Sequence, residues 1–186
     1  MISAGAARVY AKFRFFDHDT TPGPRGWNGR GRPGFRFRCT EGHAIDRGNY
    51  GGHSFGAVDF DLGRFPERAA AEAVDCRLIR RGRGTTPASP DDLFLITTCR
   101  IGALDALRFL DQFDTASRYM VSRPGIVRFR LYRSLSPAAR FQFVNLAQWR
   151  SVEAFTDAFA QDEFKSLIKG GFDHTSQIIV AKPWHQ

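Results

Sequence analysis

Two hydrogen-bonding side chains, Asn145 and Trp149, lie four residues apart in a segment rich in aromatic residues. If residues 140–149 form a strand, side chains alternate between its faces, and these two emerge on the same face. The other residues on that face are Phe141, Phe143 and Ala147. An amide offers two donors and an acceptor, and an indole N–H adds one donor. In an apolar pocket, such a pair can hold an aromatic ketone or phenolate by its oxygens while aromatic rings stack on its body.

The hydrophobic pattern of the second half of the chain indicates the elements that position this pair. A run rich in β-branched and aromatic residues predicts a strand, apolar residues three and four positions apart predict a helix, and strict alternation predicts a half-buried strand. Ser151 occupies the position of a helix N-cap. The predicted elements are a strand at 93–101, a helix from 103 to about 120–123, strands at 126–133 and 140–149, a helix at 152–167 and a strand at 175–182.

This order, βαββαβ, is that of the α+β ferredoxin-like fold, in which two right-handed crossovers place both helices on one face of a four-stranded antiparallel sheet. The opposite face then carries apolar side chains that must be covered. We expect a second copy of the chain to cover them, which predicts a homodimer, a dimeric α+β barrel. Residues 91–186 are therefore expected to form one domain that contains the functional site.

The first half of the chain differs in composition. Residues 1–90 contain 14 of the 18 glycines and 15 basic residues against 9 acidic ones, whereas residues 91–186 carry 12 against 10. Stretches such as 22–33 and 80–84 lack apolar periodicity and predict an Arg/Gly/Pro-rich leader that is largely disordered rather than a domain. The exceptions are short extended segments at 9–16 and 35–38 and an alanine-rich helix at 67–79.

The leader allows two interpretations. Its arginines are interleaved with aromatic residues such as Trp27, Phe35, Phe37 and Tyr50, a combination that can contact phosphates and stack on RNA bases. A solvated, unstructured tail is the simpler interpretation, because no ordered nucleic-acid-binding module is recognisable. We therefore expect no nucleic-acid partner, and RNA binding through the leader stays an alternative.

Composition also bears on location and metals. No apolar run reaches the roughly 20 residues that span a bilayer, and a secretory signal is not recognisable, so we expect a cytoplasmic protein without a membrane partner. Cys39, Cys76 and Cys99 are odd in number and widely spaced, which fits a reducing compartment. The spacing of Cys39, His43, His53 and Cys76 matches no zinc finger or ribbon, so no metal site is predicted. Nucleotide-binding fingerprints are not found either.

Residues 140–155 read RFQFVNLAQWRSVEAF and resemble the antibiotic biosynthesis monooxygenase family. Members of that family show F-V-N-x-A-x-W on a strand, followed by S-x-E-A-[FY] at the start of the second helix. The segment 162–165 is similar to the family's sequence near the end of that helix. The segments 94–96 and 123–125 are similar to its first strand and to the turn into its second. The resemblance covers residues 92–182, roughly half of the chain.

The resemblance implies a cofactor-independent monooxygenase that acts with O₂ on an aromatic or quinone-like small molecule, without metal or flavin. In such enzymes the activated substrate reduces O₂ itself, and the protein orients it and stabilises the oxyanion. Asn145 and Trp149 would be the catalytic donors, and Lys165 could stabilise the anion. The predicted substrate-binding residues are Phe141, Phe143, Phe155 and Phe159.

The chain departs from the family pattern at several positions. Quinone-forming members can carry a tyrosine where this chain has Phe155, so a hydroxyl that could transfer a proton is missing. Haem-degrading members place an iron-ligating His about one turn after the Phe-Lys pair of the second helix, where this chain has Ile168. They also commonly carry an Asn where Thr97 and Thr98 stand. Haem degradation is therefore disfavoured, with the position of His174 left open.

The same residues allow less specific interpretations. Asn145 can be a buried amide bonded to neighbouring backbone, and Trp149 a large core residue. Lys165 fits a solvent-exposed lysine at a helix end, where the helix dipole favours it. The alternative function is a non-catalytic barrel that binds a small hydrophobic ligand or serves in dimerisation. A pocket filled by Phe155, Phe159 and Trp149 themselves would favour that alternative.

Overall fold

The computed structural model describes residues 9–17, 35–39, 45–47, 55–62, 73–168 and 174–183. Its second half has the predicted βαββαβ order. The elements are β6 (Leu93–Ile101), η1 (Ala103–Asp105), α1 (Ala106–Val121), β7 (Ile126–Ser134), β8 (Phe143–Trp149), α2 (Val152–Ala160), α3 (Asp162–Leu167) and β9 (His174–Pro183). The strands are neighbours in the antiparallel order β7-β8-β6-β9. The predicted ferredoxin-like α+β fold is therefore confirmed.

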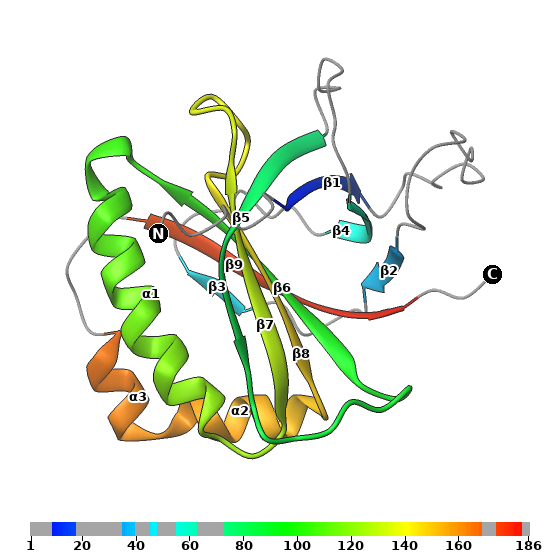
Figure 1. Ribbon diagram of the computed structural model, residues 1–186, viewed down its shortest axis with the longest axis vertical. Helices are drawn as coiled ribbons and strands as arrows, with labels where there is room; N and C mark the ends of the chain where they lie inside the picture. Colours follow the sequence, from blue (N-terminus) through cyan, green and yellow to red (C-terminus); the bar gives the residue numbers. More distant parts are fainter. Residues whose placement is uncertain are drawn as a thin grey trace, which may run out of the picture.

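The first half of the chain adds five strands to the same sheet (Figure 1). They are β1 (Tyr10–Asp17), β2 (Phe35–Cys39), β3 (Ile45–Arg47), β4 (Phe55–Leu62) and β5 (Ala73–Arg83). The order is β2-β4-β1-β5-β7-β8-β6-β9-β3, and β2 also pairs with β9. Pairing of β5 with β7 on one side and of β2 with β9 on the other closes eight strands into a barrel. The sheet is thus larger than the four-stranded one predicted.

These strands correct the prediction of a largely disordered leader, which is wrong for the described part of residues 1–90. The short segments expected to be extended are β1 and β2. The strands β1, β2, β4 and β5 contribute apolar side chains to the core at alternate positions only, as Phe13 and Phe15 show in β1. Two or three apolar residues in alternation are too weak a signal to stand out among glycines and arginines.

Two further expectations for this region change. The described part of the predicted helix at 67–79 lies in β5, which also includes most of the arginine-rich stretch at 80–84. In β5, Val74 and Cys76 face the interior and Asp75 between them does not, so burial has the two-residue period of a strand. Residues 22–33 lie outside the described part of the chain.

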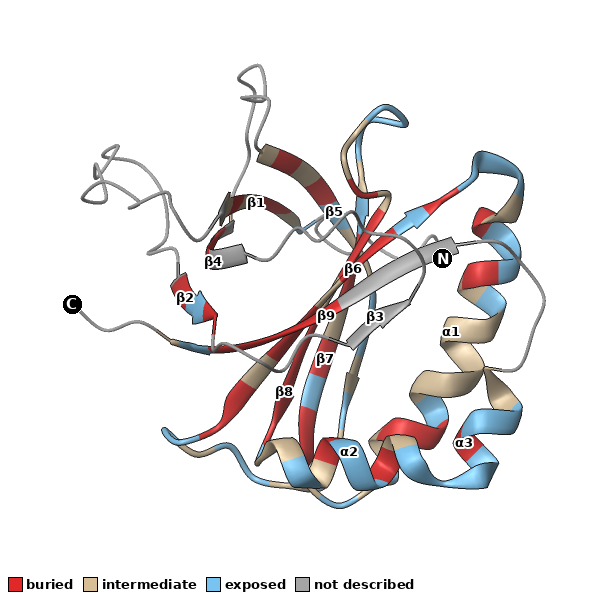
Figure 2. Cartoon of the chain, turned by 180° about the vertical axis from the view of Figure 1, so that it is seen from behind, coloured by how far each residue is buried: buried red, intermediate tan, exposed pale blue. Residues whose placement is uncertain are grey.

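The interior of the barrel is an aromatic core contributed by both halves of the chain. Figure 2 shows buried residues on strands of both halves. The ring of Phe13 lies with its centroid 5.0 Å from that of Phe60 and 5.3 Å from that of Tyr132. Phe15 packs against Phe141 at 5.0 Å. The sheet face that the sequence argument assigned to a second copy is therefore covered by strands of the same chain, and the reason for expecting a homodimer no longer applies.

The helices cover the outer face of the sheet (Figure 2). Ser151 caps α2 as predicted, because its Oγ accepts a hydrogen bond from the backbone N–H of Ala154 at 3.2 Å. An extended backbone at Gln161 separates α2 from α3, so the predicted second helix is two helices. Two apolar residues of the predicted helix from 103, Leu104 in η1 and Leu107 in α1, are 96% and 78% exposed. None of the described helices is long and apolar enough to cross a membrane.

If the first half of the chain is integral to the barrel, truncating a side chain there should destabilise the whole protein. Phe13→Ala is expected to lower the free energy of unfolding by about 3–5 kcal/mol, because a cavity replaces a buried ring. Urea denaturation followed by circular dichroism measures this. The control is Leu104→Ala at an exposed position, expected to change that free energy by less than about 0.5 kcal/mol. Equal stability of the two variants would show that β1 is not packed into the core.

Candidate functional site

A cavity of about 430 Å³ lies between the outer face of the sheet and the helices α1, α2 and α3. We call it the aromatic cavity because seven aromatic side chains line it. They are Phe109, Phe113, Phe129, Trp149, Phe155, Phe159 and Phe164. Small-molecule sites in proteins are concave, mostly apolar and about 300–1,000 Å³ in volume. The aromatic cavity is therefore the candidate functional site.

The alternation of β8 brings Asn145 and Trp149 to this cavity. Val144 and Leu146 point into the barrel core, whereas Asn145 and Trp149 point to the helix side and line the cavity. β8 lies between β6 and β7, and Asn145 is paired in register with Thr97 of β6. The amide therefore lies in the floor of the cavity rather than at its edge, and it shares the hollow with the indole.

The amide oxygen of Asn145 is buried and lacks a hydrogen-bond partner among the described residues. An unpaired buried acceptor costs about 1–3 kcal/mol, so native structures rarely keep one without a reason. Trp149, which is 2% exposed, forms the adjoining wall and contacts the ring of Phe155 edge to face at a centroid distance of 5.6 Å. A molecule bound here could satisfy the amide while lying against aromatic surface.

Helix α2 supplies two of the predicted substrate-binding rings. The centroids of Phe155 and Phe159, one helical turn apart, are separated by 4.2 Å. Phe164 of α3 continues the row, with its ring 4.4 Å from that of Phe159. These rings line the cavity and leave it open, so a flat guest can stack against them.

The other two predicted rings, Phe141 and Phe143, do not line the aromatic cavity. The chain bends at Gln142, before the regular alternation of β8 begins, and this turns Phe141 into the barrel core. Phe143 is on the helix side of the sheet, but its ring packs against that of Phe109 at 4.5 Å. The structure therefore places neither ring in the aromatic cavity.

Lys165 also lies outside the aromatic cavity. Its ammonium group is 3.0 Å from the carboxylate of Asp162 in the same helix, and its side chain is 59% exposed. The residue of α3 that faces inward is its neighbour Phe164. Its position is the one that the simpler interpretation expects, and the structure does not bring it to the aromatic cavity.

Sequence reasoning missed four further polar side chains that line the cavity. They are Thr97, Cys99, Gln112 and Ser117. Thr97 and Cys99 lie two residues apart in β6, so both face the helix side of the sheet, as Asn145 of β8 does. On α1, Gln112 lies three residues after Phe109, and Ser117 lies four residues after Phe113. That helical spacing is the signal that could have placed both on the buried side of α1.

Cys99 is the one titratable side chain among the described residues that line the aromatic cavity. Burial raises the pKa of its thiol to about 12, so it stays neutral at physiological pH. Stabilisation of the folded state by this neutral thiol is complete below the ordinary thiol pKa and is lost as pH rises toward 12. The described lining therefore offers hydrogen bonds and aromatic surface rather than a general base.

The structure describes only two of the four residues that were considered as zinc ligands, Cys39 and Cys76. Cys39 and Cys76 are buried free thiols, and burial raises the pKa of each. His43 and His53 lie outside the described residues, as does the side chain of His174. Among the side chains that the structure describes, no group of three His, Cys, Asp or Glu residues is placed to hold a metal.

Sequence comparison assigns the segment that carries this site to a family. Residues 96–170 match the profile of the antibiotic biosynthesis monooxygenase family. This part of the chain is therefore an antibiotic biosynthesis monooxygenase domain, which confirms the resemblance inferred from residues 140–155. No curated protein sequence matches the chain.

Solved structures share the fold over nearly the whole chain. An anthrone oxidase-like protein has a TM-score of 0.61 at 13% identity, covering 100% of this chain and 97% of its own. A major regulator of staphylococcal pathogenesis has a TM-score of 0.56 at 12% identity, covering 96% and 99%. A ferredoxin-fold protein related to antibiotic biosynthesis monooxygenases, from Listeria monocytogenes 4b F2365, has 0.52 at 13%, covering 94% and 95%. What these chains share is the fold, first-half strands included.

The unpaired oxygen of Asn145 leads to a prediction about the stability of the ligand-free protein. Asn145→Leu, which replaces the amide by an apolar group of similar size, is expected to leave the free energy of unfolding unchanged or raise it by about 1 kcal/mol. Ser151→Ala removes a paired polar group and should lower it by about 1 kcal/mol. Urea denaturation of both variants compares them. A loss in Asn145→Leu as large as that in Ser151→Ala would mean that the amide is satisfied within the fold.

Proposed function

We propose that this protein is a cofactor-independent monooxygenase that oxidises an aromatic or quinone-like small molecule with O₂. The observation that carries the proposal is the Asn145 side chain, whose amide oxygen is buried and unpaired among the described residues, beside Trp149 in a cavity of about 430 Å³ lined by aromatic rings. The family of residues 96–170 supports a monooxygenase-like activity. The shape of the cavity supports a flat aromatic substrate, and a protein of the same fold is named as anthrone oxidase-like.

In this proposal the protein binds and orients while the substrate supplies the electrons. The substrate ionises to a phenolate or enolate, whose oxygen accepts hydrogen bonds from the Asn145 amide N–H and the Trp149 indole N–H. One atom of O₂ becomes a new carbonyl oxygen of the substrate. The other leaves as water with two hydrogens from the substrate. Rings such as Phe155 and Phe159 hold the flat body in place during the reaction.

The chemistry of the lining restricts the substrate. A general base works best when its pKa is near the operating pH, and the high pKa of Cys99 makes its thiol a poor one. Phe155, where family members can have a tyrosine, offers no hydroxyl. We therefore infer a substrate that loses its proton readily. An anthrone is an example, because its CH₂ group lies between two aromatic rings and opposite a carbonyl in the central ring.

The test is turnover of an anthrone with O₂, followed by quinone absorbance and oxygen uptake. Asn145→Ala and Trp149→Phe are each expected to lower kcat by about 10²–10³-fold, the usual effect of removing one donor to an oxyanion. Lys165→Ala is the matched control, because its side chain lies outside the cavity, and should turn over at the wild-type rate. Wild-type rates in both cavity variants would remove the assigned roles of Asn145 and Trp149.

A second candidate function is binding of a small hydrophobic ligand without catalysis. The observation in its favour is the lining itself, which is mostly aromatic and has Cys99 as its one described titratable group. In that case the anthrone would bind and quench tryptophan fluorescence without oxygen uptake. Asn145→Ala would then weaken binding, and no quinone would form above the uncatalysed rate.

A further inference from the structure

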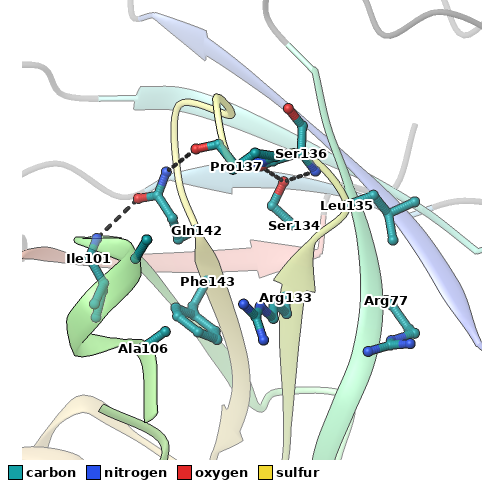
Figure 3. A pocket seen from close by; sticks show the side chains of 11 residues that line it. Arg77, Ile101, Ala106, Arg133, Ser134, Leu135, Ser136, Pro137, Gln142 and Phe143 are labelled. Carbon is teal, nitrogen blue, oxygen red and sulfur yellow. Dashed lines mark hydrogen bonds between the residues drawn. The ribbon is translucent and has the colours of Figure 1, made fainter. Parts of the chain in front are cut away.

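A second cavity, of about 350 Å³, lies on the helix side of the sheet, where Ala106 of α1 and Phe143 of β8 line it (Figure 3). It lies among β5, β7, β8, the loop after β7 and the start of α1. The rings of Phe109 and Phe143, whose centroids are 4.5 Å apart, lie between the two cavities, because Phe109 lines the aromatic cavity and Phe143 lines the second one. The second cavity is therefore a separate compartment.

Two arginines, Arg77 of β5 and Arg133 of β7, line this second cavity, which we call the arginine cavity. They are direct partners in the antiparallel register, so their side chains leave the sheet on the same face (Figure 3). Like charges placed directly opposite each other on neighbouring strands are destabilising. Both side chains are exposed, so solvent screens part of this repulsion.

Neither arginine is neutralised within the described part of the chain. No described carboxylate forms an ion pair with Arg77 or Arg133. The contrast is Arg80, also on β5, whose guanidinium Nε lies 2.8 Å from the carboxylate of Asp114 on α1. The fold therefore supplies a counter-charge to one outward arginine of β5 and leaves the opposed pair without one.

The remaining wall is apolar or already hydrogen-bonded. Gln142 accepts a hydrogen bond from the backbone N–H of Ile101 at 3.0 Å and donates to the carbonyl of Ala139 at 2.9 Å. Ile101 and the ring of Phe143 add apolar surface, and the Arg133 guanidinium lies 5.8 Å from the centroid of that ring. The groups left to bind a polar ligand are thus the two guanidinium groups, which lie beside an apolar surface.

We propose that the arginine cavity binds a small organic anion. The negatively charged group, a carboxylate, sulfonate or phosphate monoester, lies between Arg77 and Arg133, whose planar guanidiniums can each donate two parallel hydrogen bonds. The apolar body of the anion lies against Phe143 and Ile101. The volume of about 350 Å³ accommodates a compact ligand of one or two rings. This site is distinct from the aromatic cavity and does not depend on the oxygenase proposal.

The test uses a pair of fluorescent probes with the same body. Anilinonaphthalene sulfonate carries the anion, and N-phenylnaphthylamine is its uncharged counterpart. Arg77→Gln and Arg133→Gln are each expected to weaken binding of the sulfonate about tenfold or more and to leave binding of the uncharged probe unchanged. Arg118→Gln, at an exposed position on α1 outside both cavities, is the charge-matched control and should retain both affinities.

Two additional measurements complete the test. Both glutamine variants should keep or raise the Tm, because each removes one of two opposed like charges. Should either variant fail to fold, Arg77→Lys and Arg133→Lys replace them in the test. Their affinity for the sulfonate is expected to be lower than that of the wild type. Wild-type sulfonate affinity in the arginine variants overturns the proposal. Displacement of the probe by inorganic sulfate as effectively as by naphthalene sulfonate overturns the part that assigns an apolar body to the ligand.

Discussion

The structure depends on the pairing that joins its two halves, β5 with β7 on one side and β2 with β9 on the other. This pairing turns the ferredoxin-like sheet of the second half into a closed barrel, and the interior is filled by rings from both halves, such as Phe13 and Tyr132. A barrel of this size is a packed core rather than a pore. Space for a guest is consequently found on the outer face, beneath the helices.

On that outer face, bulky rings keep the helices away from the strands. Phe113 of α1 meets Phe129 of β7 edge to face at 5.6 Å, and the row formed by Phe155, Phe159 and Phe164 bounds the same hollow from α2 and α3. The break at Gln161 lets α3 turn so that Phe164 can complete this row. The aromatic cavity is thus a consequence of how the helices pack, and the strands contribute the polar floor.

The basic charge of the first half has a structural location. Along β5 and β7, opposed arginine pairs recur in the register, with Arg81 facing Arg130 and Arg83 facing Arg128 as well as Arg77 facing Arg133. Burial, and to a smaller extent the neighbouring Arg130 and Arg83, lower the pKa of Arg128. Arg77, Arg81 and Arg83 of β5 therefore lie opposite arginines of the second half, so part of the basic charge of residues 1–90 belongs to the ordered sheet.

The sequence alone determined the order of strands and helices in residues 93–183, the cap at Ser151 and the common face of Asn145 and Trp149, because all of these follow from local periodicity over a few residues. It could not show that β5 pairs with β7, since long-range pairing leaves little local trace when each strand contributes only two or three apolar residues to the core. That pairing decided that the bare sheet face is covered within the chain. Tertiary packing likewise decided that the bend at Gln142 takes Phe141 out of the cavity, that Lys165 points to solvent, and that Gln112 and Ser117 enter the site from a helix whose buried side only its neighbours could select.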